Sequence, residues 1–332
     1  MESEAPKVLA EMDAAAKARD LILSLPERNI RVLPGFFLFL AALFCVYLPL
    51  YSIVHYDAPS FVLFVGIFGG MFLFREGYRY WRYSIQGAIR KDQRPIALLC
   101  RPFKVDKYSR FPLVEIIGHA IVGLTILKYF RQTRRPGSIE EYIEPVVRLV
   151  GPFVAIGSPM EQVPRLGAHR LYCSEDQWQD TFERLIDGAC LIVAIAPTSD
   201  YAYWEIQQVI TRGALHKLFI AFGSVDWPPR PYSTFKQASA ELFPHPLPER
   251  LGSDCVLHFS FSGVPVVTSA KRRLRDRLYE DPLADAMWRA LEASNFAIKM
   301  PNFRPRSSMY LGLFLVVLAF IPILVVLFLI FR

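Results

Sequence analysis

An uncharged run from Val32 to Val54 (VLPGFFLFLAALFCVYLPLYSIV) constrains this chain more than any other feature. A helix that crosses the hydrocarbon core of a bilayer needs about 20 consecutive apolar residues. Pro34 and Pro49 do not argue against a span, because apolar spans tolerate proline better than soluble helices do. The run begins after an acidic and polar segment, Met1 to Glu27, so we expect a retained transmembrane helix and not a cleaved signal peptide.

Two further apolar runs predict additional spans. Ala58 to Phe74 is at the short end of the spanning range of roughly 17 to 25 residues, and a buried core helix is its alternative. The two runs meet at the short stretch HYDAPS, which favours a tight hairpin in the membrane. Ser307 to Phe331 is uncharged and predicts a C-terminal anchor. The predicted segments are 1–31 (cytoplasmic), 32–76 (hairpin), 77–94 (basic linker), 95–294 (cytoplasmic α/β domain), 295–306 (linker) and 307–331 (C-terminal transmembrane helix).

The basic residues indicate how the spans are oriented. They flank the start of the first run, the end of the second and the start of the third, whereas the hairpin loop has none. Cytoplasmic flanks carry such an excess of Lys and Arg, so we expect the N-terminus and the central region in the cytoplasm and the C-terminus outside. The flanking residues are Arg28, Arg31, Arg75, Arg79, Arg82, Arg90, Lys91, Arg94, Arg304 and Arg306.

The formal net charge of +7 is largely explained by these flanks, which can contact anionic lipid headgroups. A nucleic-acid partner is therefore not expected. One dense basic cluster lies elsewhere, Lys271 to Arg277 (KRRLRDR). We interpret it as a solvated or membrane-facing helix, with a phosphate-binding patch as the alternative.

The five cysteines are widely spaced, with no C-x-x-C pair and no histidine at metal-ligand spacing. This pattern fits a reduced cytoplasmic compartment and predicts no metal site. Cys100, Cys190 and Cys255 lie in apolar runs, where a free cysteine is usually a small core residue.

Between the second and third spans, short apolar runs alternate with amphipathic segments, which predicts an α/β domain with a mostly parallel sheet. We expect a flavodoxin-like sheet flanked by helices. The runs are nearly uninterrupted, as strands buried on both faces should be. The predicted strands are 95–100, 152–157, 168–172, 189–196, 216–222 and 255–261.

Helices are predicted between these strands, several with Ser or Asp as the capping residue. Pro228 to Pro248 is proline-rich without a clear period, so we expect a long loop or insertion there. Phe111 to Phe130 is apolar but contains Glu115 and His119, which are costly inside a membrane, so a core or interfacial helix is expected. The predicted helices are Ser138–Leu149, Ser174–Asp187, Ser199–Gly213 and Asp281–Ser294.

Candidate binding residues follow the predicted strands, because ligands of an open parallel sheet bind beyond the carboxyl ends of its strands. Arg101 could hold a phosphate or carboxylate and Asp106 a ribose hydroxyl; alternatively they pair with each other or with helix caps. The loop GSPMEQVPRLGA, with Gly157, Ser158 and Glu161, could contact a phosphate or could simply be a turn that needs glycine and proline. It matches neither the P-loop nor the G-x-G-x-x-G pattern.

Glu205 is the candidate catalytic residue. An apolar stripe at helical spacing (Ala202, Ile206, Val209, Ile210 and Gly213) predicts a helix facing the sheet, with Glu205 at the stripe's edge, overlooking the strand ends. Its alternative role is to complement the helix dipole, which is worth roughly 0.3 to 1 kcal/mol. Ser199, Tyr203 and Trp204 lie beside it, and the aromatic residues could wall a base pocket or form a packed corner.

The residues around Glu205 and those of the first predicted strand resemble a known group of domains. A short strand followed by SDYAYWE resembles the glutamate region of Toll/interleukin-1 receptor (TIR) domains and of the nucleoside 2-deoxyribosyltransferase-like group. PIALLCRPFKVD is similar to the opening strand of the same groups, and the resemblance covers about Pro95 to Phe222. The chain also resembles bacterial membrane proteins with Arg-Phe-Asp, Gly-Pro and Trp-Glu motifs in order. In the enzymatic members of these groups the glutamate acts on an N-glycosidic bond, and the resemblance implies that role for Glu205.

The resemblance implies a TIR-like domain that cleaves the N-glycosidic bond of NAD or a related nucleotide, as a defence or stress effector. A second hypothesis is a non-enzymatic sensor, in which a bound nucleotide changes the packing or assembly of the spans. A third is a scaffold that binds no nucleotide. The expected partners are the bilayer, a small nucleotide and further copies of the chain; no separate cofactor is expected.

Overall fold

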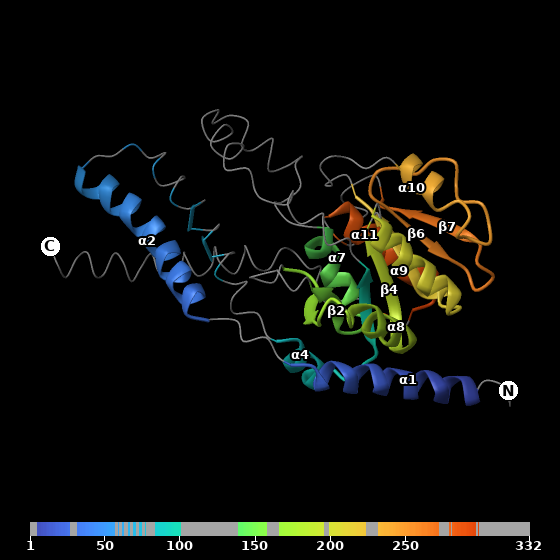
Figure 1. Cartoon of the computed structure of the whole chain (residues 1–332). Helices are drawn as coiled ribbons and strands as arrows, with labels where there is room; N and C mark the ends of the chain where they lie inside the picture. The colour runs from blue at the N-terminus through green and yellow to red at the C-terminus, as the bar shows by residue number, and fades with distance from the viewer. Residues whose placement is uncertain are drawn as a thin grey trace.

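A seven-stranded sheet forms the core of the α/β domain in the computed structural model (Figure 1). The structure describes residues 5–26, 32–56, single residues between 59 and 77, 84–100, 139–157, 166–195, 199–223, 232–271, 279, 281–296 and 298. The predictions for Phe111 to Phe130, for the third span and for nearly all of the cluster Lys271 to Arg277 lie outside these residues.

The sheet is mostly parallel, which confirms the α/β prediction. Its strand order is β3-β2-β1-β4-β5-β6-β7, with parallel pairing from β3 across to β5 and antiparallel pairing of β5 with β6 and of β6 with β7. The strands are β1 (Ile96–Cys100), β2 (Phe153–Gly157), β3 (His169–Tyr172), β4 (Ala189–Ile195), β5 (Leu218–Phe222), β6 (Cys255–Phe259) and β7 (Pro265–Ser269).

The order departs in one respect from the flavodoxin-like order 2-1-3-4-5. After β2 the chain adds β3 on the outer side of β2 before it crosses to β4. Without β3, the run β2-β1-β4-β5 has the flavodoxin-like arrangement. Strand β7 and the antiparallel pairing beyond β5 were not predicted.

Apolar side chains on both faces hold the strands in place. In β1 no residue is more than 3% exposed. Leu98 and Cys100 belong to the hydrophobic cluster on one face, and Ala97 and Leu99 to the cluster on the other. Successive side chains of a strand point to opposite faces, so a run with no polar residue requires a layer of helices on each side.

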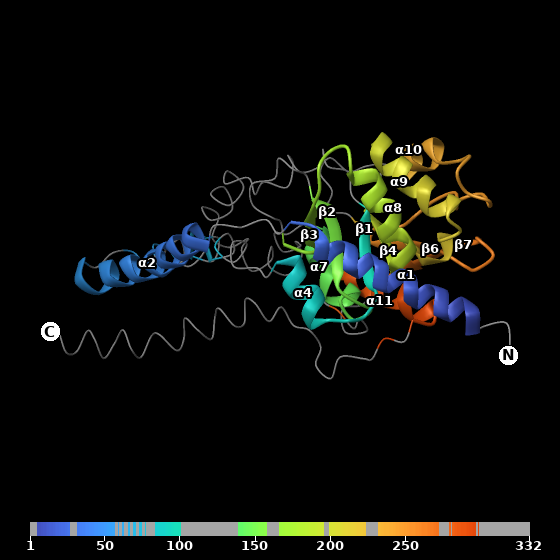
Figure 2. The ribbon, with the colours of Figure 1, turned by 60° about the horizontal axis from the view of Figure 1, so that its bottom comes forward.

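Helices cover both faces (Figure 2). Buried residues of α7 (Ile139–Val147) and α11 (Pro282–Ala293) form the core on one side. The other side is covered by α1 (Ala5–Ser24), α4 (Ile85–Lys91), α8 (Trp178–Gly188), α9 (Asp200–Thr211) and α10 (Tyr232–Ala238), and a 3₁₀ turn (η2, Leu215–Lys217) precedes β5.

One predicted capping residue is confirmed, and Asp281 is a cap that was not predicted. Ser199 Oγ accepts a hydrogen bond from the amide of Ala202 at 3.3 Å. The Asp281 carboxylate accepts hydrogen bonds from the amides of Leu283 and Ala284 at 2.9 and 3.1 Å. Such caps satisfy the amides that a helix leaves without partners in its first turn.

Two other expectations were wrong. Helix α8 begins at Trp178 and not at Ser174, because the Ser174 hydroxyl bonds to Asp176 and the intervening residues form a turn, closed by the Gln177 amide on Ser174 O at 3.1 Å. The predicted loop Pro228 to Pro248 contains α10, whose residue Phe235 is buried in the core.

The N-terminal segment forms α1, a helix that was not predicted from the sequence. Ala18 and Ile22 are buried against the domain. Gly188 ends α8, and a Cβ atom there would collide with the Ala18 side chain, so a glycine permits the close crossing of α1 and α8. Helix α1 also contacts α4, so the segments on either side of the predicted hairpin meet on the domain.

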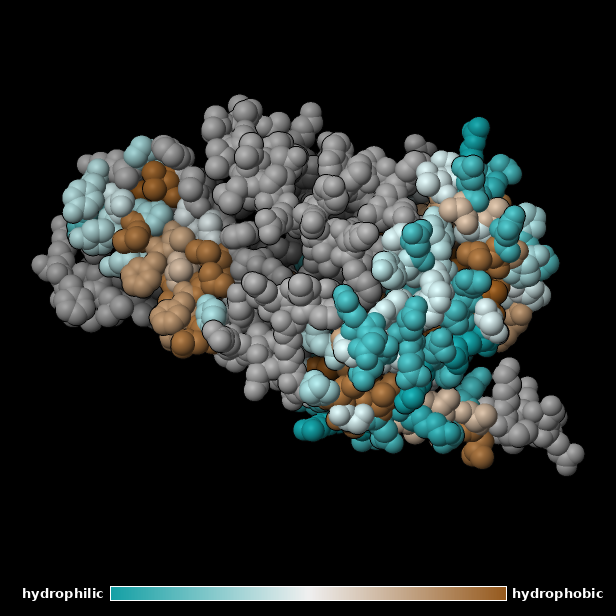
Figure 3. Space-filling view, in the orientation of Figure 1, coloured by the Kyte–Doolittle hydropathy of each residue, from teal (hydrophilic) through white to brown (hydrophobic). Residues whose placement is uncertain are grey.

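Helix α2 (Val32–Tyr56) contains the first predicted span. Among the described residues it is the one helix long and apolar enough to cross a membrane, over Leu33–Ile53 with a mean hydropathy of 2.2. Its apolar side chains are uncovered, with Phe37 60% and Phe44 57% exposed, and they form the brown surface at the left of Figure 3. Length, composition and exposure thus fit a span.

The second predicted span is described only at single residues. Gly66, Gly70 and Gly77 are helical and lie against α2. A Cβ atom at Gly70 would be 2.8 Å from Ala42 O, and one at Gly66 would collide with Cys45 O. Small residues at such spacing let two helix backbones approach closely in membranes. The number of spans and their orientation stay predictions.

Candidate functional site

The carboxyl ends of β1 and β4 meet at a topological switch point. From β1 the chain builds outward through β2 and β3, and it then returns to place β4 on the other side of β1. The two strands run parallel, with Cys100 opposite Ala194. In open α/β sheets, ligands bind in the crevice outside the strand ends at such a point.

Glu205 lies on α9, the helix that follows β4. It is 3% exposed, and its Oε2 atom is fully enclosed. A position at the edge of the apolar stripe was predicted, but Glu205 lies within the buried face together with Ala202, Ile206 and Val209. The reason is helical spacing, because residues three and four apart share one side of a helix.

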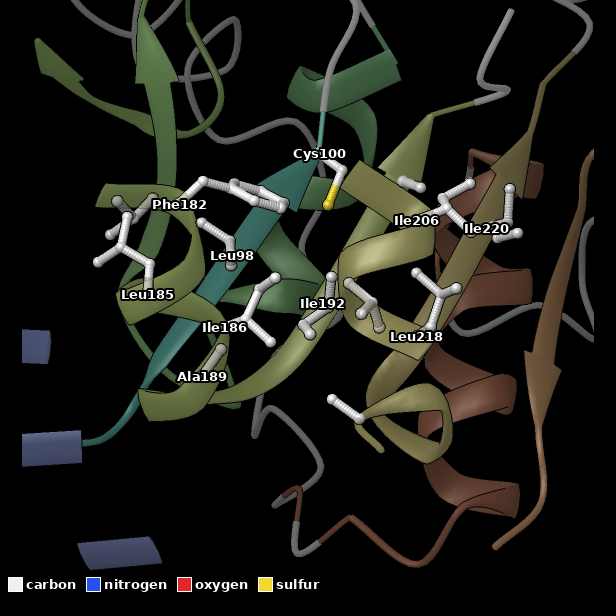
Figure 4. Close-up of a cluster of buried hydrophobic side chains, with 14 of the residues drawn as sticks. Leu98, Cys100, Phe182, Leu185, Ile186, Ala189, Ile192, Ile206, Leu218 and Ile220 are labelled. Carbon is white, nitrogen blue, oxygen red and sulfur yellow. The ribbon is translucent and has the colours of Figure 1, made fainter. Parts of the chain in front are cut away.

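The end of β1 is close to this carboxylate. Burial raises the pKa of the Cys100 thiol well above its ordinary value, and the charge of Glu205 raises it further. Figure 4 shows Cys100 at the end of β1, between Phe182 of α8 and the helix that carries Ile206. A thiol and a carboxylate therefore share the space over the switch point.

The helix dipole does not account for Glu205. The dipole acts mainly within the first turn of a helix, and the acidic residue in the first turn of α9 is Asp200. Glu205 comes six residues after the cap, Ser199. Removing a carboxylate from water costs several kcal/mol unless the protein compensates for it. The first-turn dipole is therefore not the reason for the position of Glu205.

The aromatic residues beside Glu205 form a packed corner. The Trp204 ring lies 5.0 Å from that of Trp178 and 6.0 Å from that of Phe182, between ring centroids. The Tyr203 ring stacks on the buried Phe235 with 6.4 Å between centroids. These contacts favour packing over the alternative role as walls of a base pocket.

Gly157 and Ser199 also have structural roles. A Cβ atom at Gly157 would lie 2.6 Å from Cε1 of Tyr172, so the absence of a side chain lets the tyrosine ring pack over the end of β2. Ser199 caps α9 through its hydroxyl oxygen. Both residues lie at the carboxyl edge of the sheet, as predicted, without a contact that singles out a ligand.

The other predicted binding residues, Arg101, Asp106, Ser158 and Glu161, lie outside the described residues. They follow β1 and β2 directly in the sequence. Within the described ranges, no group of three or more His, Cys, Asp or Glu residues is placed to hold a metal ion.

A buried ion pair on the opposite face was missed. Arg170 Nη2 of β3 lies 2.6 Å from Glu140 Oε2 of α7, and both side chains are 2% exposed. The only sequence signal was an arginine inside a short predicted strand and a glutamate early in a predicted helix. Cys100 was likewise assigned only to the core, because its proximity to Glu205 depends on the strand order.

No protein-family model matches the chain, and comparisons with curated proteins and with solved structures find no match either.

Proposed function

We propose that this chain is a membrane-anchored, TIR-like protein whose cytoplasmic domain cleaves the N-glycosidic bond of NAD or a related nucleotide, with Glu205 as the catalytic carboxylate. The observation that carries the proposal is the buried position of Glu205 beside the end of β1, at the switch point of the sheet. A flavodoxin-like core, β2-β1-β4-β5, agrees with the resemblance of the sequence to that group.

The chemistry suits one buried carboxylate. The bond between ribose C1′ and the cationic nicotinamide nitrogen breaks, and neutral nicotinamide leaves with the electron pair. Glu205 stabilises the positive charge that develops on the ribose, or attacks C1′ to form an ester that water then hydrolyses. The products are nicotinamide, ADP-ribose and a proton. Charge stabilisation is stronger where water is excluded.

The remaining roles follow from chain position. In this proposal Arg101 binds the phosphates, Asp106 binds a ribose hydroxyl, and the loop that contains Ser158 and Glu161 closes over the ligand. Three spans hold the domain on the cytoplasmic side, and copies of the chain assemble in the membrane. A role in defence or stress is an analogy with the resembled group.

The test is nicotinamide release from NAD by the full-length, detergent-purified protein. Glu205→Gln keeps the shape of the side chain and removes its charge. We expect it to lower release by about 100-fold or more, the lower range for loss of a catalytic group. Asp200→Asn removes a carboxylate from the exposed start of the same helix and should leave release nearly unchanged.

Equal release by Glu205→Gln and the unsubstituted protein would exclude the catalytic role. Absence of release by any variant would turn attention to the second hypothesis, a nucleotide sensor. Its support is that α1 contacts α8 and α4, so the hairpin is joined to the domain on both sides. Sensing predicts NAD binding by calorimetry without turnover, together with a change in oligomer size. A scaffold predicts no binding.

A further inference from the structure

The two edges of the sheet are built differently. At one edge, β3 has four residues, three of them buried, and Arg170 is held by an ion pair. At the other edge, β7 pairs with β6 from Cys255↔Ser269 to Phe259↔Pro265, and no described strand pairs with its outer side. An edge strand presents unpaired N–H and C=O groups, which natural proteins protect with charge, proline or cover.

Strand β7 lacks most of that protection. From Ser260 to Ala270 there is no charged residue, and the only proline is at the first position of the strand. Apolar side chains along this stretch are exposed: Phe261 by 85%, Val264 by 44%, Val266 by 39% and Val267 by 37%. The edge is therefore uncharged and apolar, in a chain of net charge +7.

The strand is also firmly held on its inner side. The buried Asp285 of α11 accepts hydrogen bonds from the Lys271 amide at 2.9 Å and from Arg289 Nε at 3.0 Å. Thr268 Oγ1 lies 3.1 Å from Nε2 of the buried His258. A frayed edge would have no such anchors, so β7 is a preformed template for another strand.

We propose that β7 pairs with β7 of a second copy of this chain, antiparallel and about a two-fold axis at Val267, to give one continuous sheet across a dimer. A two-fold axis brings the same strand to both sides of the interface. Like charges directly opposite each other destabilise a pair of strands, and this stretch has no charged residue that could face its own copy.

The register follows from the same reasoning. With the axis at Val267, the residue four positions later, Lys271, lies across from Gly263 of the other copy, four positions earlier. The first positive charge after the strand thus faces a residue without a side chain. The stretch from Ser260 to Ala270 carries no charge, so it adds no like-charge repulsion between two copies. Anchoring in a shared membrane would raise the effective concentration of the partner.

The first experiment measures molar mass by light scattering on the full-length protein in detergent. Val267→Lys puts a charge at the axis, opposite its own copy, and Val267→Thr keeps a β-branched residue there. We expect the unsubstituted protein and Val267→Thr to be dimers at concentrations where Val267→Lys is a monomer, with at least a tenfold weaker association. Circular dichroism confirms that the variants are folded.

A second experiment does not depend on a destabilising charge. In an antiparallel pair, directly opposed Cβ atoms lie about 4.5 to 5.5 Å apart, close enough for a disulfide after a small adjustment. Single cysteines are placed from position 265 to 269, with Ser262→Cys as the control away from the axis. We expect Val267→Cys to cross-link at least tenfold faster than Ser262→Cys and than the unsubstituted chain with its own five cysteines.

Two outcomes would overturn the proposal. One is the same mass for all three position-267 proteins with equal cross-linking at every position. The other is large aggregates that Val267→Lys dissolves, without a cross-linking maximum between 265 and 269, which would mean adhesive edges and no defined dimer. Neither outcome depends on whether the domain cleaves NAD.

Discussion

Polar side chains are buried on both faces of the sheet, but their surroundings differ between the two faces. On the face covered by α7 and α11, Glu140 is paired with Arg170 at 2.6 Å, and His258 bridges Thr268 and Ser294, each at 3.1 Å. On the face covered by α8 and α9, the buried Glu205 lies beside the Cys100 thiol at the carboxyl edge. On the first face the buried polar groups join neighbouring elements to one another. On the second face, we propose, the buried carboxylate of Glu205 is catalytic.

Burial alone does not mark a functional group, because Glu140 is as buried as Glu205. The two glutamates differ in their location. Glu140 joins a helix to an edge strand, whereas Glu205 lies at the topological switch point between β1 and β4. Variants on each face should therefore change different properties.

The largest expected effect is on the α7 face. Arg170→Met removes the guanidinium that faces the buried carboxylate of Glu140, so we expect the free energy of unfolding to fall by about 3 to 5 kcal/mol. Urea unfolding of the full-length protein in detergent measures it. The control is Arg184→Met, which removes an exposed pair with Asp180 and should cost close to nothing. Equal losses of unfolding free energy in the two variants would mean that the buried ion pair does not stabilise the fold.

Gly157 allows the binding and packing roles to be separated at the carboxyl edge. Gly157→Ala places a Cβ atom 2.6 Å from the Tyr172 ring, and we expect a loss of about 1 to 3 kcal/mol from overpacking. In the background of Tyr172→Leu most of that loss should disappear, which a double-mutant cycle would detect. A phosphate-contact role predicts weaker nucleotide binding instead, with no rescue by Tyr172→Leu.

Ser199 offers a smaller test on the α9 face. Ser199→Ala removes the cap of the helix that carries Glu205, and we expect a loss of about 1 kcal/mol in the free energy of unfolding. Ser199→Asp keeps an acceptor for the Ala202 amide and should retain stability. If Ser199→Asp lost nicotinamide release while remaining stable, the hydroxyl would have a role in binding beyond the cap.

The central strands were predictable from sequence because their apolar runs are almost uninterrupted. β1, β2 and β4 each begin and end within one residue of the predicted limits. Strand β7 was missed because PVVTS is short and half exposed, so it lacks that signature. Helix α1 was missed because its buried stripe relies on Ala18 and Ile22, and small residues give a weak apolar period.

The candidate site was predictable only in part, for a topological reason. The position of Glu205 after a strand follows from the sequence. Its proximity to Cys100 requires β4 to lie beside β1, and a chain pattern does not reveal which strands are neighbours. The same limit applies to Arg170, whose partner Glu140 is 30 positions away in the sequence.

The smallest expected effect is a pH dependence on the α7 and α11 face. Burial lowers the pKa of His258, which stacks on Phe219. The unfolded chain therefore binds the proton better than the folded one. The stability from neutral His258 is present above its unfolded pKa of about 6.5 and is lost as the pH falls below it. Between pH 7.5 and 5.5, His258→Gln should lose less thermal stability than the unsubstituted protein. The exposed His245→Gln serves as the control, and an equal loss in all three proteins would show that other groups set the acid sensitivity of this face.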